Sequence, residues 1–103
     1  MINNNKLLIE AIEILALNAN DKREYLIKLF GNNHFNLDEI LLEYDDAKFL
    51  QDYYNEDIKE IFSELDKLLE KIDEFKLYNI DDLNHDIWNQ VRNKSIEVLK
   101  LIK

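Results

Sequence analysis

The sequence predicts an all-α fold, a compact antiparallel bundle of about five helices. Its 103 residues include one glycine and no proline, so the residues that most often interrupt helices are almost missing. Apolar residues recur at intervals of three and four along most of the chain, which is the spacing of a helix face that packs against a core. No alternating run supports a sheet, and no linker rich in Gly, Ser or Pro divides the chain. We therefore expect residues 1–103 to form a single helical domain.

The first predicted helix runs from about Asn5 to Asn18. Three of its apolar residues lie at helical spacing: Leu8, Ile12 and Leu15. A second, shorter helix is expected to begin at about Asp21, which together with Glu24 resembles a capping box. The only glycine, Gly31, is expected to close this helix, because helices commonly end at a glycine.

A third predicted helix is capped by Asn36 with Glu39 and reaches about Leu50. The Tyr53-Tyr54-Asn55 segment indicates a break in the chain. Asn55 is a suitable N-cap for a fourth helix, because its side-chain oxygen can accept from a free backbone N–H, and acidic residues follow it in the first turn.

The fourth predicted helix has the most regular apolar spacing in the sequence. Its apolar residues are Ile58, Ile61, Phe62, Leu65, Leu68, Leu69, Ile72 and Phe75. A polar link over residues 78–82 separates it from a fifth helix, which starts near Asn84 and continues to the C-terminus. The apolar or small residues expected to face the core from this last helix are Ile87, Trp88, Val91, Ser95, Val98, Leu99 and Ile102.

The chain has the composition of a soluble protein. It has no cysteine, which excludes disulfides and thiolate metal sites and fits a reducing compartment. Residues 1–6 lack the basic region and cleavage site of a signal peptide, and apolar stretches of a few residues are far too short to span a bilayer. We expect a cytoplasmic protein without a membrane partner.

Negative charge is concentrated in the middle of the chain. Between Asp38 and Asp86 there are 17 Asp or Glu residues and five Lys, whereas residues 1–37 are balanced and residues 87–103 are net positive. The formal net charge of the whole chain is −9. Such a field repels nucleic acid and anionic lipid and attracts a basic partner at long range, so we expect no direct nucleic-acid partner.

No group of residues in the sequence has the pattern of a catalytic or metal site. The Asp82-Leu83-Asn84-His85 spacing resembles one half of a di-metal motif, but no second half accompanies it. Ser63 and Ser95 lie inside predicted helices, without a glycine nearby that could open an oxyanion hole. We therefore expect a protein that is not an enzyme and that needs no metal or cofactor.

One stretch combines acidic residues with aromatic residues that cannot all be buried. The candidate partner-binding residues are Glu43, Asp45, Asp46, Phe49, Asp52, Tyr53, Tyr54, Glu56 and Asp57. Tyrosine is enriched in interface hot spots, and surrounding acids complement a basic surface. The alternative is that Phe49 and Tyr53 pack on the fourth helix and that the acids are simply solvated. Tyr44 and Trp88 are expected in the core.

Three segments together resemble a family of small bacterial proteins. They are the acidic segment Asp38-Glu39-Ile40-Leu41-Leu42-Glu43-Tyr44-Asp45-Asp46-Ala47, the leucine-rich Leu65-Asp66-Lys67-Leu68-Leu69, and the aromatic-led Ile87-Trp88-Asn89-Gln90-Val91-Arg92. In this order, over about residues 36–102, they resemble immunity proteins of contact-dependent growth inhibition systems. The resemblance implies binding to a cognate toxin domain, often a nuclease that acts on tRNA or DNA, and occlusion of its active site or substrate groove.

The expected function is therefore that of an immunity protein that binds a toxin domain with a basic surface. Two other functions remain open at this point. The chain could be an acidic nucleic-acid mimic that inhibits a defence nuclease, or a structural bundle that associates with itself through the fourth helix. The oligomeric state is also open, because a continuous apolar seam serves a bundle and a dimer equally.

Overall fold

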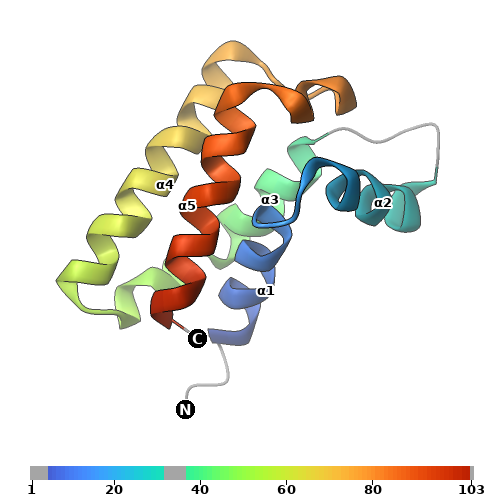
Figure 1. The fold of residues 1–103 in the computed structure, drawn as a ribbon. Helices are drawn as coiled ribbons and strands as arrows, with labels where there is room; N and C mark the ends of the chain where they lie inside the picture. Colours follow the sequence, from blue (N-terminus) through green and yellow to red (C-terminus); the bar gives the residue numbers. More distant parts are fainter. Residues whose placement is uncertain (1–4, 32–36, 103) are drawn as a thin grey trace.

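A computed structural model describes residues 5–31 and 37–102 (Figure 1). The α-helices are α1 (Asn5–Leu15), α2 (Ala19–Phe30), α3 (Asp38–Ala47), α4 (Glu56–Phe75) and α5 (Asp86–Ile102), and the short 3-10 helices are η1 (Lys48–Tyr53) and η2 (Ile80–Asn84). The described residues include no strand. The prediction of an all-α bundle of five helices is confirmed.

The bundle is built around α5, which packs against α4 on one side and against α1 on the other. Helix α1 also packs against α3, and η1 closes the connection from α3 to α4 (Figure 1). The neighbouring pairs α4–α5, α5–α1 and α1–α3 run antiparallel, whereas α2 crosses the direction of the other helices and contacts η2 (Figure 1). Helix α3 therefore packs against α1, and it is linked to α4 through η1 and through the hydrogen bond from Tyr44 to Asp66.

The core is formed by the apolar stripes that the sequence spacing predicts. In α4 the buried residues are Phe62, Leu65, Leu69 and Ile72, and in α5 they are Ile87, Trp88, Val91, Ser95 and Val98. Tyr44 and Trp88 are both 1 % exposed, as expected of core residues. Phe75 is 58 % exposed, so the buried stripe of α4 ends one turn before the helix does.

The helix ends agree only partly with the predicted caps. Asn55 caps α4 as predicted, because its Oδ1 accepts from the backbone N–H of Ile58 at 3.0 Å. Helix α2 starts earlier than predicted, because Asn18 has an extended backbone and its Oδ1 accepts from the N–H of Asp21 at 2.8 Å. Gly31 closes α2 at φ +80°, a backbone conformation that only glycine adopts without strain. The predicted cap at Asn36 lies outside the described residues.

The connections on either side of α4 are helical rather than irregular. Helix α3 tightens into η1 after Ala47 instead of continuing to Leu50, and the predicted polar link contains η2. The turn after α4 is fixed by the indole N–H of Trp88, which donates to the carbonyl oxygen of Leu77 at 3.0 Å. The core aromatic of α5 therefore also fixes the end of the preceding helix.

Candidate functional site

The nine predicted interface residues lie on three consecutive elements and the short turn between η1 and α4. Helix α3 carries Glu43, Asp45 and Asp46; η1 carries Phe49, Asp52 and Tyr53; Tyr54 follows η1; and the first turn of α4 carries Glu56 and Asp57. All except Tyr54 are exposed. We call these eight exposed residues the acidic–aromatic surface.

The two aromatic residues of this surface do not pack on α4. Phe49 is 62 % exposed and Tyr53 is 72 % exposed, although both are large apolar side chains. Leu50 is fully buried and takes the inward position of η1. Phe49, which directly precedes Leu50, and Tyr53, at the last position of η1, face solvent. Both side chains are therefore exposed, and the binding role of this surface stays a prediction.

Tyr54 has a different environment from the other eight residues. It is half-buried, and its ring centroid lies 5.7 Å from that of Phe62 with the rings tilted by 47°. Among the described residues its hydroxyl has no hydrogen-bond partner, and burial raises its pKa. Tyr54 therefore anchors the turn between η1 and α4 to the core, and it adds little to the exposed surface.

A polar network below the surface fixes α3, η1 and α4 relative to one another. The hydroxyl of Tyr44 donates to Oδ1 of Asp66 at 2.7 Å and accepts from Nε2 of Gln51. The ammonium of Lys48 lies 3.8 Å from Oδ2 of Asp66. Burial and the adjacent charge of Asp66 raise the pKa of Tyr44 well above its ordinary value. The neutral hydroxyl is thus retained as the donor that links α3 to α4.

Most of the carboxylates in the surface have no cation beside them. Lys59 Nζ lies 3.7 Å from Oδ1 of Asp52 and 3.9 Å from Oε1 of Glu56. Both carboxylates are exposed to solvent, so these ion pairs contribute little to stability. Within residues 5–31 and 37–102, no Lys or Arg forms an ion pair with the other four acids, Glu43, Asp45, Asp46 and Asp57. The negative charge of this surface is therefore largely uncompensated.

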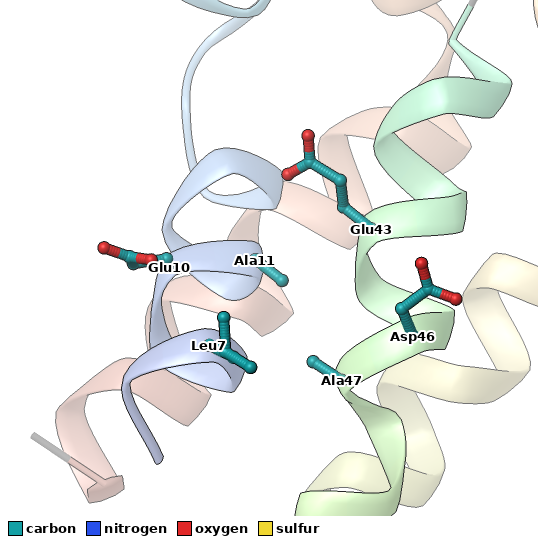
Figure 2. Close-up of a pocket in the computed structure, with 6 residues that line it drawn as sticks. All are labelled: Leu7, Glu10, Ala11, Glu43, Asp46 and Ala47. Atoms are coloured by element: carbon teal, nitrogen blue, oxygen red, sulfur yellow. The ribbon is translucent and has the colours of Figure 1, made fainter. Parts of the chain in front are cut away.

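The structure adds residues from α1 that the sequence did not identify. A pocket of about 270 Å³ lies between α1 and α3 (Figure 2). It is lined by Leu7, Glu10 and Ala11 from α1 and by Glu43, Asp46 and Ala47 from α3. The only sequence signal for this pocket is Leu7, an apolar residue that does not belong to the core spacing of α1. In the structure Leu7 is 60 % exposed.

The described residues contain neither a cluster that could hold a metal ion nor a helix that could span a membrane. No three His, Asp or Glu side chains in this part of the chain are grouped so that they could hold a metal ion. None of the described helices has the length and apolar character needed to cross a bilayer.

Comparison of the chain with protein-family models, with curated proteins and with solved structures found no match.

Proposed function

We propose that this chain is a cytoplasmic immunity protein, which binds a toxin domain with a basic surface and neutralises it without performing catalysis. The observation that carries the proposal is the exposure of Phe49 and Tyr53 among carboxylates of which, within the described residues, only Asp52 and Glu56 pair with a lysine. Large exposed apolar groups clustered in a polar rim are typical of a protein-binding surface. The resemblance of the sequence to immunity proteins supplies the class of partner.

The charge distribution supports a nuclease as the target. A nuclease holds phosphates in a basic groove, so an inhibitor that covers the groove gains from acidic residues at its surface. With a net charge of −9, the chain would also be steered toward such a groove, and steering raises association rates by roughly 10- to 1,000-fold. Neutralisation would then follow from occlusion of the substrate site.

Self-association through α4 has less support than partner binding. The apolar stripe of α4 that could serve as a seam is buried inside the bundle, where α4 packs against α5. A structural role would need a comparable apolar stripe outside the bundle, whereas the exposed face of α4 is dominated by Glu and Lys.

The first test is affinity capture from lysate of the native host at low and moderate salt, followed by a growth-protection assay with the recovered toxin domain. The proposal expects one basic toxin domain whose association slows as salt rises. Recovery of a nucleic-acid-binding defence nuclease would favour the mimic, and recovery of this chain alone would favour the structural bundle.

Matched variants then test the surface itself. Phe49→Ala and Tyr53→Ala are expected to weaken partner binding by at least about tenfold, as hot-spot aromatics do. Phe75→Ala is the control, because Phe75 is similarly exposed at the far end of α4. Equal effects of Phe49→Ala and Phe75→Ala, or protection that survives the double variant, would contradict the assignment of this surface.

A further inference from the structure

The pocket between α1 and α3 is one part of a longer open groove. A second pocket of about 390 Å³ adjoins the first and shares Glu10 and Glu43 with it. Its remaining lining residues are Glu13, Ile14, Leu17 and Tyr25. The groove therefore follows α1 from Leu7 to the end of the helix at Leu15 and reaches Leu17 beyond it, with α3 and Tyr25 of α2 as its other wall. The helical part, from Leu7 to Leu15, corresponds to about 12 Å, or roughly two turns.

The floor of the groove is apolar and narrow. Ala11 is 4 % exposed and Ala47 is 3 % exposed, and they face each other from α1 and α3 (Figure 2). Leu7 and Ile14 lie four residues before and three residues after Ala11, so these three share one flank of α1. This flank is additional to the core stripe of α1, whose Leu8, Ile12 and Leu15 are fully buried.

Carboxylates border the groove on both sides. Glu10 on α1 lines the groove together with Glu43 and Asp46 on α3, and its carboxylate points away from α3 (Figure 2). None of these three carboxylates forms an ion pair with a Lys or Arg of the described segments. At the far end the hydroxyl of Tyr25 donates to Oε1 of Glu43 at 2.8 Å. Exposed carboxylates that border an apolar groove attract a cationic occupant.

We propose that this groove receives a basic amphipathic α-helix of the protein partner. Apolar side chains of that helix would contact Leu7 above the floor formed by Ala11 and Ala47, and its flanking Lys or Arg side chains would pair with Glu10 and Asp46. A third helix packs naturally into the groove between two packed helices, and small residues at the contact permit close approach. The described residues offer no free strand edge to which an extended peptide could add.

This inference rests on the proposed function, because it names the structural element by which the same basic partner would be held. Glu43 and Asp46 belong to both the acidic–aromatic surface and the groove, so one partner could engage both. The groove extends the interface onto α1, a helix for which the sequence analysis predicted no contact.

The test is an NMR titration of the ¹⁵N-labelled full chain with a synthetic helical peptide. The peptide carries Leu on one face and Lys and Arg on the flanks, and a control peptide of equal composition has its Leu residues scattered around the helix. We expect the amphipathic peptide to shift the amides of residues 7–17 and 43–47 and to bind at least about tenfold more tightly than the control. Shifts confined to α4, or equal affinity for the two peptides, would overturn the proposal.

A pair of charge reversals separates the groove from general attraction. Glu10→Lys changes an exposed residue of the groove, and Glu70→Lys changes an exposed residue of α4. Both variants carry the same net charge, and neither removes a core side chain. The amphipathic peptide should lose about tenfold in affinity with Glu10→Lys and much less with Glu70→Lys. Equal losses of affinity would mean that peptide binding depends on net charge alone.

The same variants distinguish failure of the groove from failure of the proposed function. If Phe49→Ala abolishes toxin protection while Glu10→Lys leaves both protection and peptide binding intact, the function stands and the groove assignment is wrong. If the peptide binds in the groove but no variant affects any toxin, the groove binds a basic helix and the immunity function is wrong.

Discussion

The ammonium of Lys22 lies 5.2 Å from the centre of the Trp88 ring, in a site where Lys22 is only 2 % exposed. No carboxylate of the described residues pairs with it. Burial and, to a smaller extent, the positive charge of Arg92 together lower the pKa of Lys22 to about 8. At neutral pH the folded protein thus holds a charged amine that is compensated mainly by the face of an indole.

Replacing this amine with an apolar side chain of similar length should stabilise the protein. The lowered pKa of Lys22 means that its charged form is disfavoured in the fold, so removing the amine should increase the free energy of unfolding. Lys22→Met also loses the cation–π contact with Trp88, which reduces this increase by about 1 kcal/mol. We expect a net rise of about 1–2 kcal/mol in the free energy of unfolding, measured with urea at pH 7. A loss of stability would mean that the contact with Trp88 outweighs desolvation.

Stability should rise with pH above pH 8. The pKa of Lys22 is about 8 in the fold and 10.5 in the unfolded chain, so between these values the unfolded chain binds more protons. The free energy of unfolding should increase by up to about 1.4 kcal/mol per pH unit between pH 8 and 9.5. The trend reverses above about pH 10, because the pKa values of Tyr25 and Tyr78 are raised to about 12 in the fold. In Lys22→Met the rise should be absent.

Removing the exposed aromatic residues should leave the fold almost unchanged. Phe49→Ala and Tyr53→Ala should each change the free energy of unfolding by less than about 0.5 kcal/mol, because neither side chain is buried. Phe62→Ala, at a fully buried position, should cost about 3–5 kcal/mol in the same denaturation experiment. A large effect of either exposed substitution would show that these side chains contribute to the core.

The stability of the protein should depend on the Tyr44 hydroxyl, which links Asp66 and Gln51 below the acidic–aromatic surface. Tyr44→Phe removes the hydroxyl that donates to Asp66 and accepts from Gln51. It should lower the free energy of unfolding by about 1–2 kcal/mol, measured by thermal or urea denaturation. Tyr78→Phe is the control, since its hydroxyl donates to Asp73 at an exposed site and should contribute less. If the two substitutions have equal effects, burial of the Tyr44 network does not add to its strength.

The sequence predicted the helices well and the caps less well. The buried stripe of α4 followed directly from its spacing, because a 3-4-3 pattern fixes which face packs. The start of α2 was misplaced, since Asn18 and Asp21 are both good caps and the choice between them depends on where α1 ends. The burial of Lys22 was not predicted, because lysine is ordinarily exposed and only the arrangement of α2 on α5 encloses it.

The residues of the candidate surface were proposed from the sequence, but the exposure of its aromatic side chains was not predicted. Phe49 and Tyr53 were left undecided because a change from α to 3-10 winding at Lys48 alters which side chains face inward. The groove could not be predicted from the sequence, for a different reason. Leu7 and Ala47 are 40 residues apart in the sequence, and nothing short of the packed bundle indicates that α1 and α3 form two walls of one groove.

The buried indole of Trp88 gives the chain a built-in optical reporter. It is the only tryptophan, and it lies near the start of α5, at the opposite end of the bundle from η1 (Figure 1). Its emission should shift to longer wavelength when the protein unfolds and stay constant when a partner covers Phe49 and Tyr53. Trp88 fluorescence therefore reports unfolding separately from partner binding in the same sample, without a dye attached to the acidic–aromatic surface.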